Sequence, residues 1–134
     1  MTPAELAQDI LDTHHAYLYE HMPALDRALT APGVPDAVSQ PWRELVAILE
    51  EHLQKEEEVL FPAILAGESG DLAPVIEAMV GEHDQIRACE RTLRGVAALV
   101  PDHAGPLLAL LDDLGVHAGR EDDELFPAVT RGDR

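Results

Sequence analysis

The chain has 134 residues, a formal net charge of −17 from 26 acidic and 9 basic side chains, and a single cysteine. This length suffices for one domain, residues 1–134, whose core needs no disulfide, and a lone cysteine cannot form one within the chain. An excess of acidic groups is repelled by phosphate backbones and by anionic lipid, which argues against nucleic acid or a membrane surface as partner.

The beginning of the chain and its hydropathy bear on location. The sequence MTPAELAQDI is polar and acidic, and it lacks the basic and apolar segments that make up a secretory signal. No run of about 18 apolar residues occurs, so no transmembrane helix is expected. These features predict a cytoplasmic protein.

Apolar residues recur at helical spacing along four segments, which are separated by breaks that contain proline and glycine. The first helix is predicted over Pro3–Leu29, where Thr2 and Glu5 can form a capping box around its start. The residues predicted to face the core, over all four helices, are Leu11, Leu18, Met22, Leu25, Leu29, Leu45, Ile48, Leu49, Val59, Leu60, Ala63, Ile76, Met79, Val80, Ile86, Leu93, Ala97, Leu107, Leu110, Leu111, Leu114, Leu125 and Ala128.

The second helix is predicted over Pro41–Leu65, with Ser39 as its cap and Gly67 as its stop. The third is predicted over Leu72–Val100 and the fourth over Pro106–Val129. Four helices joined by three short connections indicate an all-α fold, an up-down-up-down four-helix bundle.

An internal repeat links the second and fourth helices. Residues 51–64 read EHLQKEEEVLFPAI and residues 116–129 read VHAGREDDELFPAV, and six of these 14 aligned positions are identical. The identical positions include a histidine and a glutamate as well as core residues. The bundle is therefore predicted to consist of two helix hairpins related by a pseudo-twofold axis.

The duplicated polar residues fall on the predicted inner faces. His52 and Glu56 are four residues apart and share a helix face, and His117 and Glu121 repeat the arrangement. A buried carboxylate without a partner costs several kcal/mol, and a bound cation would remove that cost. The sequence therefore predicts that both glutamates bind metal.

The other two helices each offer one inward histidine, His15 in the first and His83 in the third. His14 is the alternative to His15. A single histidine on a helix face is more often an ordinary core residue than a ligand, and this structural role is favoured for His14, His21 and His103. For His15, His52, His83 and His117, however, an inward histidine without a metal would have to occur on four helices at once. In the acidic runs Glu56–Glu58 and Glu121–Glu124, only the first residue is expected to face inward, and the residues that follow it are expected to be mostly solvated.

Imidazole and carboxylate groups together suit iron, zinc or manganese. Four histidines and two carboxylates suit two ions better than one, because each glutamate can offer an oxygen to both. The predicted metal ligands are His15, His52, Glu56, His83, His117 and Glu121.

The motifs that contain these residues are THHAYLYEHMPAL, EHLQKEEEVLFP, GEHDQIR and HAGREDDELFP. With them the chain resembles the hemerythrin-like (HHE cation-binding) family over nearly its whole length, and it is most similar to the di-iron branch that includes iron–sulfur cluster repair proteins. Oxygen-carrying hemerythrins have a further histidine at the position of Arg87, and their last carboxylate falls at Asp122. The internal repeat favours Glu121 instead.

The resemblance implies a non-haem di-iron centre in which an oxo or hydroxo group bridges the two irons. Such a centre would bind, sense or process O2, NO or peroxide in a stress response. Zinc or manganese would fit the same ligands. Two further hypotheses are iron donation to an iron–sulfur client protein and a metal-free acidic helical module that binds other proteins.

Overall fold

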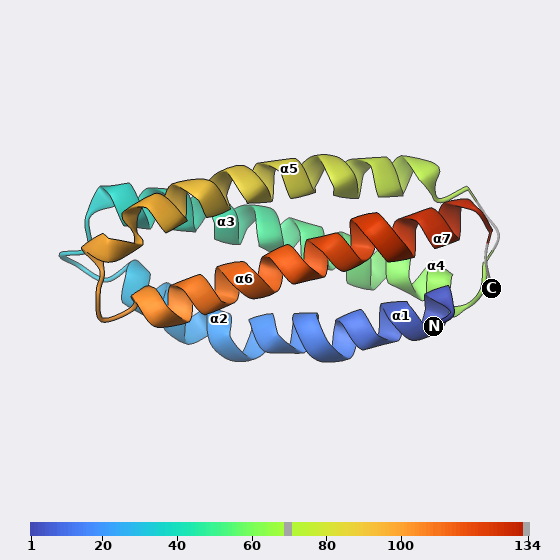
Figure 1. Cartoon of the computed structure of the whole chain (residues 1–134), viewed down its shortest axis with the longest axis horizontal. Coiled ribbons are helices and arrows are strands. Elements are labelled where there is room, and N and C mark those ends of the chain that lie inside the picture. The colour runs from blue at the N-terminus through green and yellow to red at the C-terminus, as the bar shows by residue number, and fades with distance from the viewer. Residues whose placement is uncertain (69–70, 133–134) are drawn as a thin grey trace.

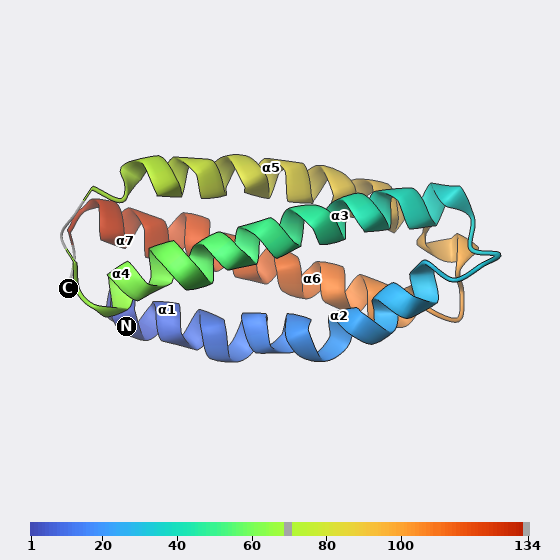
Figure 2. The same cartoon turned by 180° about the vertical axis from the view of Figure 1, so that it is seen from behind.

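The computed structural model describes residues 1–68 and 71–132. Within them the chain forms four long helical rods that run alternately up and down, and Figures 1 and 2 show the rods side by side from opposite faces. The elements, in chain order, are α1 (Pro3–Ile10), η1 (Leu11–His15), α2 (Ala16–Leu29), α3 (Asp36–Lys55), η2 (Glu56–Leu60), α4 (Phe61–Leu65), α5 (Ala73–Val96), η3 (Ala97–Leu99), α6 (Ala104–Arg120), η4 (Glu121–Leu125) and α7 (Phe126–Thr130). The predicted up-down-up-down bundle is confirmed.

The first rod has the limits that its sequence predicts. The Thr2 side chain accepts a hydrogen bond from the Glu5 backbone N–H, and the Glu5 side chain accepts one from the Thr2 N–H, both at 3.1 Å. At the end of the second rod, Gly67 adopts a φ of +68° and terminates the helix, as the sequence predicts.

The second rod begins earlier than predicted, at Asp36 and not at Pro41, and the assignment of Ser39 as its cap is wrong. Ser39 is buried inside the helix. The extra turn includes Val38 in the helix. Because Val38 precedes Trp42 by four residues, both side chains lie on one face, where they are fully buried. Burial of this apolar pair offsets the backbone hydrogen bond that Pro41 cannot make.

Two residues predicted to face the core, Val59 and Val80, are 52% and 38% exposed. Val59 lies in η2, a π-helical turn whose wider spacing turns it outward, whereas Leu60 is buried as predicted. In α5 the inner position is taken by Met79, and Val80 lies one residue around the helix from it.

Three π-helical turns, η1, η2 and η4, interrupt three of the four rods. In η2 the Phe61 N–H reaches back five residues to the Glu56 carbonyl, and in η4 the Phe126 N–H does the same to Glu121. The proline that follows each phenylalanine has no N–H for an ordinary helical bond, which favours the wider turn. A wider turn also lets the glutamate and the phenylalanine five residues later both point inward.

The apolar core falls into two clusters among the described residues. One cluster lies towards the loops that join α2 to α3 and α5 to α6, and it contains Trp42. The other lies where α1, α4 and α7 meet, and it contains Phe61 and Phe126. Between the two clusters is a layer of buried histidine and carboxylate side chains, level with the π-helical turns. None of the described helices combines the length and the apolar character that crossing a bilayer requires.

One buried carboxylate outside this layer, that of Glu90 in α5, carries a stability prediction. Its Oε1 atom is buried without a hydrogen-bond partner among the described residues. Burial raises the pKa of Glu90 above its usual value, although Arg94 and Arg87 counteract the effect. The folded protein therefore holds the proton of Glu90 more tightly than the unfolded chain does, and the ionised form costs stability at neutral pH.

Replacing Glu90 by Gln should stabilise the chain at pH 7 by about 1 kcal/mol, because the mutation removes a buried unpaired charge. The gain should shrink as the pH falls through the folded-state pKa and vanish below about 4.5, where Glu90 is protonated in both states. Denaturant unfolding of both proteins between pH 4 and pH 8 measures this difference. A gain that stays constant over the range would contradict the assignment to Glu90 ionisation.

Candidate metal centre

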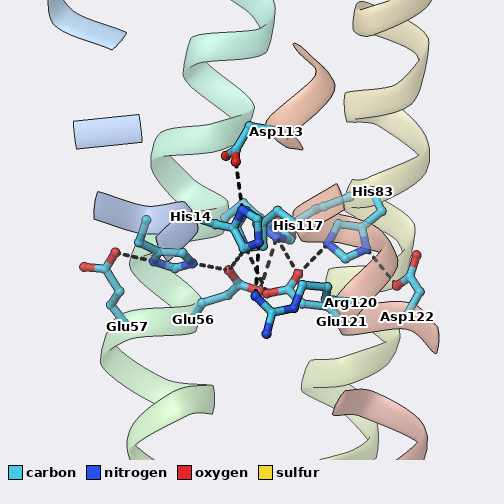
Figure 3. Close-up of polar contacts among 12 residues, drawn as sticks. His14, Glu56, Glu57, His83, Asp113, His117, Arg120, Glu121 and Asp122 are labelled. Atoms are coloured by element: carbon cyan, nitrogen blue, oxygen red, sulfur yellow. Dashed lines mark hydrogen bonds and ion pairs between the residues drawn. The ribbon is translucent and has the colours of Figure 1, made fainter. Parts of the chain in front are cut away.

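All six residues predicted to bind metal lie in the polar layer, and each is at most 3% exposed. They come from every rod and form two groups, each with ligand atoms within 4.8 Å of one another. The first group is His15, Glu56, His117 and Glu121, and the second is His52, Glu56, His83 and Glu121. Figure 3 shows Glu56 and Glu121 near the centre of the layer. Both glutamates therefore belong to both groups.

Glu56 lies between histidines of the two groups. Its Oε1 is 3.1 Å from His15 Nε2 and 3.6 Å from His117 Nε2. Its other oxygen, Oε2, lies 3.4 Å from His52 Nε2. One carboxylate thus presents one oxygen to each group, which is the arrangement of a carboxylate that bridges two ions.

Glu121 takes the equivalent position from the fourth rod. Its Oε1 lies 2.9 Å from His83 Nε2 and 3.9 Å from His52 Nε2, whereas its Oε2 lies 3.1 Å from His117 Nε2. Glu121 therefore faces both groups, as Glu56 does, and Asp122 lies outside them. Between the two carboxylates that the sequence left open, the geometry favours Glu121.

The donor atoms fit a pair of cations. His52 Nε2 and Glu56 Oε2 are buried without a hydrogen-bond partner among the described residues, because their 3.4 Å approach does not meet hydrogen-bond geometry. Two carboxylates in a fully buried layer carry a large desolvation cost. Divalent ions bound to the inward nitrogen and oxygen atoms would offset that cost and satisfy both atoms.

Three of the inward histidines are held from behind by carboxylates. His15 Nδ1 lies 2.7 Å from Glu57, and His83 Nδ1 lies 2.8 Å from Asp122. His52 Nδ1 lies 3.0 Å from Glu82. A carboxylate at Nδ1 accepts the ring proton there, so the Nε2 lone pair is left pointing into the centre, as a metal ligand requires.

Without bound metal, protons take the place of the cations. Burial lowers the pKa of His52, but the nearby carboxylates of Glu121 and Glu56 outweigh burial and raise the pKa to about 10. Burial likewise opposes protonation of His117, and the charge of Glu121 raises its pKa to about 10. Burial raises the pKa of Glu56, yet hydrogen bonds within the layer hold it well below its usual value. Metal binding must therefore release protons, and acid must weaken it.

The sequence Leu-Phe-Pro occurs in both halves of the repeat, at residues 60–62 and 125–127, and each phenylalanine packs against a histidine of the centre. The Phe61 ring stacks on His15 with centroids 5.6 Å apart, and Phe126 stacks on His83 at 6.1 Å with an 8° angle between the planes. The repeat thus explains three inward groups at once: a histidine and a glutamate that face the centre, and a phenylalanine that covers one side of it.

His14 is buried and lies behind His117, outside both groups. The two rings stack with centroids 5.4 Å apart and planes 6° apart. His14 Nδ1 lies 2.9 Å from Asp113, and Arg120 donates to His14 Nε2 at 3.2 Å. This is the ordinary structural role that the sequence favours for His14.

Sequence reasoning missed the carboxylates that hold the inward histidines. Glu57 and Asp122 were expected to be solvated, but both are partly buried and bind the Nδ1 atoms described above. The signal was present in the repeat, where the two residues occupy equivalent positions and keep their charge. Glu82 left no such signal, because it lies outside the two repeated segments.

Comparisons with known proteins agree with this geometry. The model of the hemerythrin HHE cation binding domain matches residues 6–129. The iron-sulfur cluster repair protein YtfE of Cronobacter sakazakii is 29% identical over 151 residues, which cover 98% of this chain and 67% of that protein. YtfE of Escherichia coli O157:H7 is 28% identical over 148 residues, which cover 97% of this chain and 67% of that protein.

No solved structure gives a significant match. The family match covers almost all of the helical bundle, including every histidine and glutamate of the polar layer. By this match, the chain belongs to the hemerythrin HHE cation binding domain family.

Proposed function

We propose that the chain is a non-haem di-iron protein in which His15 and His117 hold one ion, and His52 and His83 hold the other. Glu56 and Glu121 would bridge the two ions. The observation that carries this proposal is that two buried donor groups share both carboxylates. A single ion could use only one group and would leave the two histidines of the other group, and the glutamate oxygens that face them, without a cation.

We further propose that the centre binds or processes a small reactive species, namely O2, NO or peroxide, in a stress response. Bound iron would supply redox chemistry and a coordination position open to such a ligand. Each group offers four side chains, fewer than the six donors that octahedral iron accepts. Fully buried Leu60, Phe61 and Leu125 would keep water from the layer, so a small apolar molecule would enter more readily than a charged one.

Elemental analysis of the purified protein, followed by an optical spectrum before and after addition of NO, tests the proposal. Because there are two donor groups, we expect about two irons per chain, and we expect the addition of NO to change the optical spectrum. Zinc alone, or an iron spectrum indifferent to NO and peroxide, would contradict it. A metal-free chain whose melting temperature chelators leave unchanged would instead support a metal-free acidic module that binds other proteins.

The names of the relatives favour a second candidate function. Both compared proteins are called iron-sulfur cluster repair proteins, and this chain aligns with two thirds of their length. The chain would then donate iron to a client protein with a damaged cluster. Incubating the iron-loaded chain with an iron–sulfur protein stripped of its cluster distinguishes the two: iron transfer supports donation, whereas retained iron that reacts with NO supports small-molecule chemistry.

A further inference from the structure

The groups that hold the ligand histidines from outside differ between the two halves of the centre. On the side of His52, Glu82 is paired with Lys55, whose Nζ lies 2.6 Å from Glu82 Oε2. On the side of His83, Asp122 is paired with Arg87, whose Nη2 lies 2.7 Å from Asp122 Oδ2. In this half, each carboxylate that holds a histidine is therefore matched by a cation.

The half formed by His15 and His117 has a different surrounding. The carboxylate behind His15, that of Glu57, accepts a hydrogen bond of 2.6 Å from the Tyr19 hydroxyl. Burial and the neighbouring Glu57 raise the pKa of Tyr19 to about 12, so this partner is a neutral phenol at physiological pH. Tyr19 and Arg87 each follow a ligand histidine by four residues, and they take equivalent places on opposite sides of the centre.

His117 is covered by His14, which lies between Asp113 and Arg120. The Arg120 guanidinium is itself paired with Asp9, at 2.6 Å. Around His15 and His117, three carboxylates (Glu57, Asp113 and Asp9) thus face one cation. Around His52 and His83, two carboxylates face two cations. Of the further carboxylates near Arg87, Asp84 is 79% exposed and screened by water, and the buried Glu90 is offset by Arg94 as well as by Arg87.

We infer that the two ion positions are unequal, with the ion at His15 and His117 held more tightly and the ion at His52 and His83 released first. This inference rests on the proposed di-metal function. A carboxylate at Nδ1 strengthens an imidazole as a metal ligand, and a cation paired with that carboxylate reduces the effect. The more negative surrounding of His15 and His117 also attracts a divalent cation more strongly.

Adding Zn²⁺ stepwise to the metal-free full chain tests the order of filling, with the imidazole nitrogen signals followed by NMR. Zinc is suitable because it has no unpaired electrons to broaden the signals. We expect the His15 and His117 signals to change during the first equivalent and those of His52 and His83 during the second. Simultaneous filling, or the reverse order, would overturn the inference but leave the two-ion function intact. Binding of fewer than two ions would instead overturn the function.

Two variants with opposite expected effects test the cause. Arg87→Gln removes the cation from Asp122 and should tighten the weaker ion by about threefold to tenfold, a modest effect because Arg87 is partly solvated. Asp122→Asn removes the carboxylate and should weaken that ion by about tenfold or more. If both substitutions weaken binding, Arg87 serves only to position Asp122, and the inference fails.

Arg94→Gln is the matched control for the loss of a positive charge. Arg94 lies on the same helix and pairs with the exposed Asp112 at 2.8 Å, away from the six ligands. We expect it to change neither zinc affinity by more than about twofold, since exposed pairs interact weakly. An effect as large as that of Arg87→Gln would show that net charge, and not the contact with Asp122, sets the affinity.

The reciprocal substitution is Tyr19→Arg, which places a cation beside Glu57. Tyr19 is 56% exposed, so the longer side chain has room. The tighter zinc affinity should fall by about threefold to tenfold and approach the weaker one. Tyr19→Phe, which adds no charge, should leave the order of filling unchanged. An unaltered tight position in Tyr19→Arg would contradict the inference.

Discussion

Replacing Glu56 by Gln should reduce the iron content from about two ions per chain to below one. The amide keeps the size of the side chain but removes the charge and one of the two oxygens that face the donor groups. Since Glu56 belongs to both groups, the substitution should weaken both positions and not only one. Elemental analysis of protein purified from iron-supplemented cells measures the effect.

Glu58→Gln is the control, because Glu58 lies in the same π-helical turn but is exposed, and its side chain accepts a hydrogen bond from Gln54 at 3.3 Å. This variant should retain its iron and its melting temperature. Iron content that stays unchanged in Glu56→Gln would show that Glu56 is not a ligand. An equal loss of iron in both variants would indicate that the acidic turn acts through its overall charge.

Trp42→Ala should destabilise the chain by about 3–5 kcal/mol, which corresponds to a melting temperature lower by about 10–20 °C for a domain of this size. Trp42 is fully buried in the apolar cluster away from α1 and α7, and its Nε1–H donates to Asp26 at 2.8 Å. Truncation leaves a large cavity and removes the hydrogen bond. Thermal and denaturant unfolding measure the loss.

Trp42→Phe separates these two contributions in part, since it loses the donor but keeps an aromatic ring and leaves a much smaller cavity than alanine does. Asp26 is partly exposed and can bind water in its place, so the cost should be about 1–2 kcal/mol. Because Trp42 lies outside the polar layer, both variants should keep the iron content of the parent protein at low temperature. A loss of iron without a loss of stability would contradict this separation.

The sequence predicts the four rods and their antiparallel order because apolar residues recur at a spacing that only a helix turns to one side. It also predicts which polar residues interrupt the apolar faces, and the structure brings all six of them into one layer. The internal repeat was the most informative signal, because it duplicates His52 and Glu56 together with the phenylalanine that packs beside them.

Features set by contacts between helices were not predictable in the same way. Val59 was misplaced because a period of 3.6 residues assumes a regular helix, and η2 is a wider turn. The pairing of His52 with Glu82 depends on the relative height of two rods, which the spacing within either rod does not specify. The start at Asp36 depends on the burial of Val38 against other helices. This burial outweighs Pro41, which would ordinarily mark the first turn of a helix.

The division of the apolar core by the polar layer affects how the bundle opens. Apolar contacts make folding cooperative, and here the polar layer interrupts them on every rod. The buried histidines and carboxylates of the layer are then the side chains that connect the two apolar clusters, and bound ions would hold all four rods together at that level. Fraying that begins near α1 and α7 would stop there in the loaded protein, whereas loss of the ions would let the two ends exchange their amide hydrogens as separate units.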